Sequence, residues 1–159
     1  MFLYKKIKCS LFVFILLMST AAHAETAINI ENAWSPEAPP VTKVMAGYMK
    51  INNISNKDIK IKLIKSDLFK RVEIHLTEMK DGMMRMIKQE NLTIKGKSHI
   101  ELKPGGLHMM LMGKLKSVKS GSTIPVSLNF DNGETIKINL KVKSNSRPQM
   151  KCGSGKCGS

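Results

Sequence analysis

Apolar and polar residues alternate with a period of two along most of the chain between residues 28 and 142. In the segments 59–63 and 136–142, isoleucine, leucine or valine at every second position is separated by lysine or asparagine, which is typical of strands with one buried face. No segment of ten or more residues has a convincing helical period. Turn signals recur at short intervals, at Asn52-Asn53, Asp81-Gly82, Lys95-Gly96-Lys97, Pro104-Gly105-Gly106, Gly121 and Asp131-Asn132-Gly133. This pattern predicts an all-β Greek-key sandwich or barrel.

The two ends of the chain differ from this body. Three lysines, a short apolar run from Leu11 to Met18 and the sequence Ala22-His23-Ala24 have the order of a secretory signal, so we expect residues 1–24 to be removed after Ala24. Cys9 precedes the apolar run and is badly placed for a lipid anchor. We expect one domain over residues 25–143. The segment 144–159 is almost free of apolar residues and is predicted to be a disordered tail.

Charge and cysteine content narrow the class of function. The 159 residues carry a net charge of +14, and loss of three lysines with the signal leaves 23 basic and 12 acidic residues, or +11. Secretion and the lack of aromatics among the lysines argue against nucleic acid. The lysines keep strand faces solvated or steer the protein toward an acidic partner or an anionic membrane surface. The predicted domain contains no cysteine, so it is not a disulfide framework.

Methionine is concentrated in one part of the chain. Of 12 methionines, seven lie between Met79 and Met112, and His75 and His108 bracket most of this stretch. Strand cores favour Val, Ile and aromatics, so the cluster calls for another reason. Thioether sulfur is a soft ligand suited to Cu(I), and imidazole binds copper in either oxidation state.

A hairpin closed at Asp81-Gly82 would bring two of these residues close together. With a two-residue loop, His75 pairs with Lys88 and Thr77 pairs with Met86. His75 and Met86 are then diagonal neighbours on one face, about 7–8 Å apart at the backbone and within reach of long side chains.

The next segment offers a second histidine and methionine. His108 and Met110 are two positions apart on a strand and point to one face. Two strand pairs can therefore supply an N2S2 site. Each residue also has an ordinary interpretation, with His75 as a partly exposed strand residue and Met86 or Met110 as core filler. The others are core filler or a soft rim around the site: Met79, Met83, Met84, Met109 and Met112.

The spacing of the four candidate ligands identifies a resemblance. Ten residues separate His75 from Met86, twenty-one separate Met86 from His108, and one separates His108 from Met110. This spacing resembles the H-x10-M-x21-H-x-M signature of the periplasmic copper-A chaperone family. Other matching landmarks are Trp34 before a proline-rich stretch, Ala46-Gly47-Tyr48, Val72-Glu73-Ile74-His75, Asp81-Gly82, Leu102-Lys103-Pro104-Gly105-Gly106 and His108-Met109-Met110-Leu111-Met112-Gly113. The resemblance covers about residues 28–142.

This resemblance implies a cupredoxin-like β-sandwich that binds one Cu(I) through His75, Met86, His108 and Met110. It also implies copper delivery to the CuA centre of cytochrome c oxidase subunit II, often alongside a thiol-bearing Sco-type partner. We expect a periplasmic monomer whose copper binding weakens in mild acid, as protons compete for the histidines. The chain departs from the family at Leu76, where members often have methionine, and in its cysteine-containing tail.

Other functions fit less well or stay open. A blue-copper electron carrier needs a cysteine thiolate with two histidines, and the domain has none before Cys152. No nucleophile–base motif or Gly-rich phosphate loop indicates an enzyme. Copper sequestration without an oxidase target fits the same ligands. Cys152 and Cys157 either form a secondary copper site or a disulfide, whereas His99 fits no ligand spacing.

Overall fold

The computed structural model describes residues 26–144, which contain ten β-strands and no helix. The all-β fold predicted from the alternating pattern is therefore confirmed. The strands are β1 (Ile28–Pro36), β2 (Val44–Asn53), β3 (Ile59–Lys65), β4 (Phe69–Lys80), β5 (Met83–Lys88), β6 (Thr93–Ile94), β7 (Ser98–Leu102), β8 (Leu107–Lys114), β9 (Thr123–Phe130) and β10 (Thr135–Lys143). The segments 59–63 and 136–142, predicted as strands, lie in β3 and β10.

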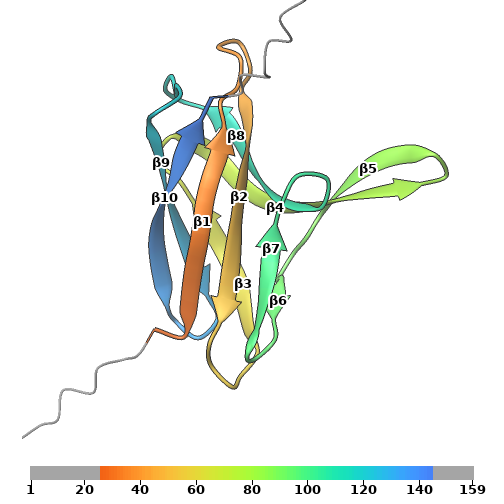
Figure 1. Cartoon of the computed structure of the whole chain (residues 1–159), viewed down its shortest axis with the longest axis vertical. Helices are drawn as coiled ribbons and strands as arrows, with labels where there is room; N and C mark the ends of the chain where they lie inside the picture. The colour runs from red at the N-terminus through yellow and green to blue at the C-terminus, as the bar shows by residue number, and fades with distance from the viewer. Residues whose placement is uncertain (1–25, 145–159) are drawn as a thin grey trace, which may run out of the picture.

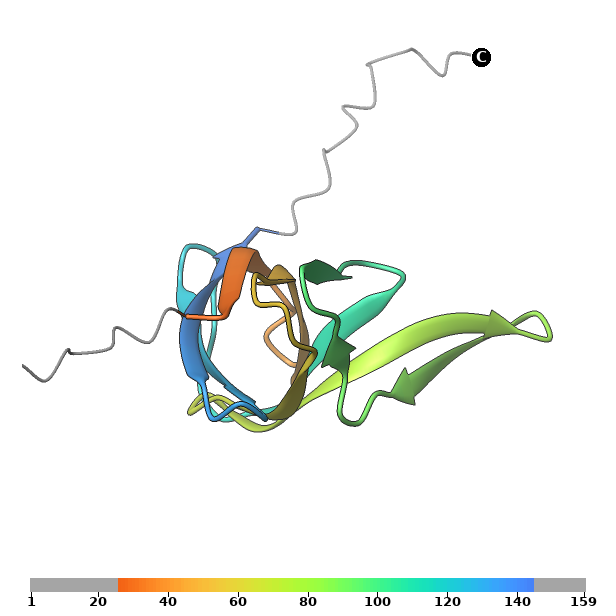
Figure 2. The same cartoon turned by 90° about the horizontal axis from the view of Figure 1, so that it is seen from below.

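The strands curve around a common interior. Their order is β5-β4-β8-β2-β1-β10-β9-β3-β6, and β7 pairs with β2. β1 and β10 pair in parallel and the other pairs are antiparallel. Figures 1 and 2 show this body with one feature outside it, the β4–β5 hairpin, which projects to one side. The candidate ligands all lie where this hairpin joins the body.

Alternation along the strands divides core from surface beside the hairpin. In β8, Met109 and Leu111 are fully buried, whereas His108 and Met110 belong to the other face of the strand. The core is built mainly from Ile, Leu and Val of the other strands, with Met45 and Met49 of β2 among them. Met109 is thus core filler, one of the two roles predicted for it.

The β4–β5 hairpin turns at Asp81-Gly82, as predicted. Both residues have positive φ, 53° and 73°, which is the requirement of a two-residue type I′ turn. The predicted register is also confirmed, since His75 pairs with Lys88 and Thr77 with Met86. The first half of β4 packs on the core, but every residue of β5 is exposed.

Several sequence predictions fall outside the described residues. They are the predicted signal at 1–24 and the predicted tail beyond Ser144, which contains Cys152 and Cys157. Within residues 26–144, no helix has the length and apolar character needed to cross a membrane.

Candidate metal centre

β4 and β8 place the two candidate histidines side by side. The strands are antiparallel partners, and His75 lies directly opposite His108 in their register. The centroids of the two imidazole rings are 6.2 Å apart, with a tilt of 41° between the ring planes. Because Ile74 and Met109, the neighbours of the histidines, point into the core, the pleat holds both rings on the opposite face.

The two candidate methionines flank this histidine pair from different strands. Met110 lies opposite Glu73, two positions from His108, and Met86 lies opposite Thr77 in the hairpin. Met86 is 57% exposed, whereas His108 is only 7% exposed. The candidate metal centre therefore has a buried side on β8 and an open side on β5.

An open groove of about 500 Å³ connects three of the four candidate ligands. His108, Met110 and Met86 line it, together with Met84. His75 is not among the lining residues and lies beside the groove, against His108. We call this feature the methionine groove. The remaining lining residues come mainly from β2 and the segment after β1: Pro36, Glu37, Ala38, Pro39, Val44, Met45, Ala46, Tyr48, Thr77 and Gly105.

Each of the two histidines uses one ring nitrogen in a hydrogen bond within residues 26–144, and the other nitrogen has no such bond there. The Nδ1 of His108 lies 3.0 Å from the carbonyl oxygen of Gly106, and the Nε2 of His75 lies 2.9 Å from a carboxylate oxygen of Glu73. Since carbonyl and carboxylate oxygens only accept, each of these nitrogens carries the proton and donates. In the neutral rings the lone pairs then lie on Nδ1 of His75 and Nε2 of His108.

The Nδ1 atom of His75 is buried and has no hydrogen-bond partner among residues 26–144. A buried acceptor without a partner carries a desolvation cost of about 1–3 kcal/mol. A bound metal ion would use this lone pair and remove that cost. The donor set at this place therefore fits a metal ion that accepts imidazole nitrogen.

Glu73 is the residue that orients His75. Its side chain is 17% exposed and also contacts Arg71 Nε at 3.3 Å and Lys88 Nζ at 3.7 Å. The hydrogen bond with His75, and then the positive charges of Lys88 and Arg71, lower the pKa of the Glu73 carboxyl from its ordinary value. Glu73 thus stays ionised and accepts a hydrogen bond from His75 Nε2, an arrangement that fixes ring orientation in metal sites.

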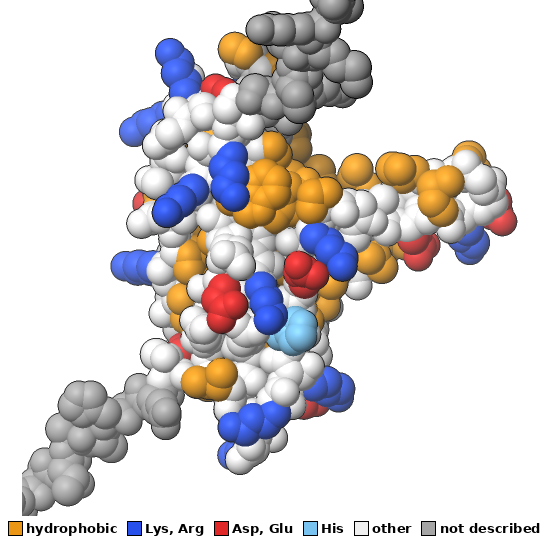
Figure 3. Space-filling model, in the orientation of Figure 1, with side chains coloured by type: hydrophobic (Ala, Val, Ile, Leu, Met, Phe, Trp, Pro, Cys, Tyr) orange, Lys and Arg blue, Asp and Glu red, His pale blue; other side chains and the backbone are white. Residues whose placement is uncertain are grey.

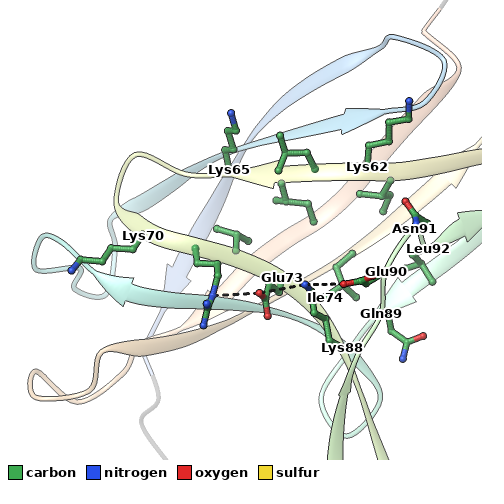
Figure 4. Close-up of a pocket in the computed structure, with 15 residues that line it drawn as sticks. Lys62, Lys65, Lys70, Glu73, Ile74, Lys88, Gln89, Glu90, Asn91 and Leu92 are labelled. Atoms are coloured by element: carbon green, nitrogen blue, oxygen red, sulfur yellow. Dashed lines mark ion pairs between the residues drawn. The ribbon is translucent and has the colours of Figure 1, made fainter.

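Figure 4 shows the ion pairs that hold Glu73 in place. Glu73 and Lys88 line a hollow of about 520 Å³ between β3, β4 and the segment after β5. Lys88 contacts Glu90 at 3.1 Å as well as Glu73, so the paired charges run from Arg71 across to Glu90. Seven Lys, Arg or Glu side chains line this hollow together with apolar ones, whereas the lining of the methionine groove includes one, Glu37.

The remaining candidates are not brought to this centre. His99 lies on β7, exposed and opposite Asn52 of β2, consistent with its lack of a ligand spacing. Within the described part of the chain, no group of three or more His, Cys, Asp or Glu side chains is arranged to hold a metal. The candidate donors beside the histidine pair, beyond Glu73, are therefore thioethers.

Sequence reasoning missed Glu73 and the carbonyl of Gly106. Glu73 is two positions before His75 and therefore on its face of β4, a signal present in the sequence Val72-Glu73-Ile74-His75. The role of the Gly106 carbonyl had no sequence signal, because any residue has a carbonyl.

Comparisons with known proteins agree with this architecture. A family model described as "Putative lipoprotein LpqE-like" matches residues 28–142. The chain belongs to this LpqE-like family. Uncharacterized protein RP573 of Rickettsia prowazekii is 30% identical over 134 residues, which cover 82% of this chain and 74% of RP573.

Solved structures similar to this LpqE-like chain include PCuAC domains. The copper-bound PCuAC domain from PmoF2 has a TM-score of 0.65 at 20% identity, covering 77% of this chain and 97% of that domain. The Cu(I) form of DR1885 from Deinococcus radiodurans has a TM-score of 0.59 at 27% identity, covering 82% and 87% of the two chains. The predicted cupredoxin-like fold and the resemblance to the copper-A chaperone family are confirmed.

Proposed function

We propose that this protein is a periplasmic copper chaperone that carries one Cu(I) ion on His75, Met86, His108 and Met110. The observation that carries the proposal is the histidine pair beside the methionine groove, in which the buried Nδ1 of His75 has no hydrogen-bond partner among residues 26–144. Two relatives of the same fold are described as copper-bound or as a Cu(I) form.

The chemistry of the four ligands suits a carrier. Cu(I) accepts soft thioether sulfur and imidazole nitrogen. Neutral thioethers hold it less tightly than thiolates, so an acceptor protein can displace them. The exposed Met86 is the ligand such an acceptor would reach first, while His108 is buried.

We propose the CuA centre of cytochrome c oxidase subunit II as the destination, directly or through a Sco-type thiol protein. The predicted signal at 1–24 and the lipoprotein description of the family support export to the periplasm. Sequestration for copper resistance would use the same ligands but would require no acceptor.

The first test is anaerobic Cu(I) titration against a competing chromophoric chelator. It uses the chain from Glu25 with both tail cysteines changed, Cys152→Ser/Cys157→Ser. We expect this chain to bind one Cu(I) ion tightly enough to compete with the chelator. The Met86→Leu/Met110→Leu variant should no longer compete, whereas the control His99→Ala should bind like the parent chain. A chain that binds no ion in competition with the chelator would refute the four-ligand site.

A second measurement separates delivery from sequestration. The loaded chain is mixed with the metal-free CuA domain of subunit II, with and without a Sco-type protein, and the absorption of the assembled centre is followed. A chaperone transfers its copper under these conditions. Retention of all copper by the loaded chain would favour sequestration.

A further inference from the structure

Three of the four methionines in the β4–β5 hairpin lie on the same face as the candidate metal centre. In the register of the hairpin, Met79 is directly opposite Met84, and the next same-face pair is Thr77 with Met86, followed by His75 with Lys88. Because strand side chains alternate, thioethers therefore extend along one face from the outer end of the hairpin to His75. Met83 points to the opposite face.

These outer methionines are not needed for packing. Met79 is 66% exposed and Met84 is 67% exposed, and neither belongs to the hydrophobic core. Met84 also lines the groove that contains Met86, His108 and Met110. In Figure 3, hydrophobic side chains line one edge of the projecting hairpin and continue onto the body beside it. The face is thus continuous with the candidate metal centre.

Two methionines directly opposite each other are well placed to bind one metal ion together. The Cβ atoms of such residues are about 5 Å apart, and methionine is long and flexible enough to bring both sulfurs to one ion. Two thioethers without imidazole make a softer, weaker site than the N2S2 set. Weak binding at an exposed place is the property of a site that exchanges its ion quickly.

We infer that Met79 and Met84 form a second, weaker Cu(I) site, from which the ion moves through Met86 to the four-ligand centre and back. This inference rests on the proposed copper function. Along the hairpin, one Cu–S bond forms as another breaks. At the four-ligand centre, bonds to Met110 and to the unprotonated ring nitrogens of His75 and His108 replace those to Met79 and Met84. The ion stays Cu(I), and no proton moves, because neither the thioethers nor these ring nitrogens carry one. The hairpin would then be the route by which copper enters and leaves.

The test follows each methionine methyl group separately by NMR. The chain from Glu25 with Cys152→Ser/Cys157→Ser is labelled with [13C-methyl]methionine and titrated anaerobically with Cu(I) supplied as its acetonitrile complex. We expect the first equivalent to shift the methyl signals of Met86 and Met110. The second equivalent should shift those of Met79 and Met84 and leave Met83 unchanged.

Matched variants separate the two sites. Met79→Leu/Met84→Leu should lose the second equivalent, keep the first, and release copper to a chelator several-fold more slowly. Met83→Leu, equally apolar on the opposite face of the same hairpin, should change none of these.

Each contrary result has one meaning. If the first equivalent leaves Met86 and Met110 unshifted, the proposed function fails. If it shifts them but Met79 and Met84 do not respond to the second equivalent, or respond only together with Met83, the outer site is refuted.

Discussion

The two histidines of the proposed metal centre differ in the acceptor of a single hydrogen bond. His108 donates from Nδ1 to the main chain at Gly106, whereas His75 donates from Nε2 to the side chain of Glu73. A carbonyl of the backbone is present whatever residue occupies position 106. The orientation of His75 therefore depends on one replaceable side chain, and that of His108 does not.

Removal of the Glu73 carboxylate should weaken copper binding. We expect Glu73→Ala to lower Cu(I) affinity about 10–100-fold, the usual loss when the group that orients a metal-ligating histidine is removed. Glu73→Gln should restore part of the affinity, because its amide oxygen still accepts a hydrogen bond from His75. Chelator competition measures both variants.

The control is Glu101→Ala, at an exposed carboxylate of β7 that pairs with Lys103. It should bind copper like the unchanged chain. Equal affinity in Glu73→Ala and Glu101→Ala would contradict the orienting role of Glu73.

Between strands, a few polar contacts decide where each element ends. The turn signal at Asn52-Asn53 predicts a chain reversal, but Asn53 is the last residue of β2 and is only 2% exposed. Its amide nitrogen donates to the carbonyl oxygens of Lys57 and Ile94, and its oxygen accepts from the Ser55 amide. The reversal follows Asn53. Its polar side chain can be buried because it forms hydrogen bonds with the surrounding backbone.

Asp58 ties the start of β3 to the turn before β7. Its carboxylate accepts from Lys95 Nζ at 2.7 Å and from the Gly96 amide at 3.0 Å. The Lys95 hydrogen bond, and then the Gly96 hydrogen bond, lower the pKa of Asp58 from its ordinary value of 3.8. In the acid range the unfolded chain therefore binds more protons at Asp58 than the folded one.

This pKa shift predicts that the stability lost in Asp58→Asn depends on pH. The contribution of Asp58 to stability is complete above its ordinary pKa and is lost as the pH falls through the lowered value. Asp58→Asn should be less stable than the unchanged chain at pH 7, and the gap should narrow as the pH falls below the ordinary pKa in urea unfolding curves. A gap independent of pH would contradict the assignment. Asp67→Asn is a suitable control, since within residues 26–144 its exposed side chain has no hydrogen bond or ion pair.

At the scale of the whole molecule, methionine occurs in two settings, packed in the core of the body and exposed on the β4–β5 hairpin. Met109 is fully buried in the body, and Gly47 packs so closely on it that a Cβ added to Gly47 would lie 3.3 Å from the Cβ of Met109. Met79 projects with the hairpin and is 66% exposed. The body carries stability and the hairpin carries exposed sulfur.

Truncation of Met109 and of Met79 should affect the free energy of unfolding to different extents. Met109→Ala should lower the free energy of unfolding by about 2–5 kcal/mol, because it leaves a core cavity. Met79→Ala should change it by less than about 0.5 kcal/mol, as expected for an exposed position. Urea unfolding followed by circular dichroism measures both. A similar loss in the two variants would mean that the hairpin is part of the cooperative core.

Local patterns in the sequence predicted the all-β class, the strands around residues 59–63 and 136–142, and the Asp81-Gly82 hairpin with its register. These features depend on alternation and on turn residues that tolerate positive φ, and both act between residues close in the chain. The pairing of Met86 with Thr77, and hence its place near His75, followed from the hairpin alone.

Only the tertiary structure decided which distant strands meet. The pairing of β4 with β8 sets His75 against His108, and no local pattern specifies a contact between residues so far apart in the chain. The same packing buries His75 Nδ1, which has no hydrogen-bond partner among residues 26–144. The sequence by itself determined which donors are available, and packing of the whole chain determined which donor atoms converge.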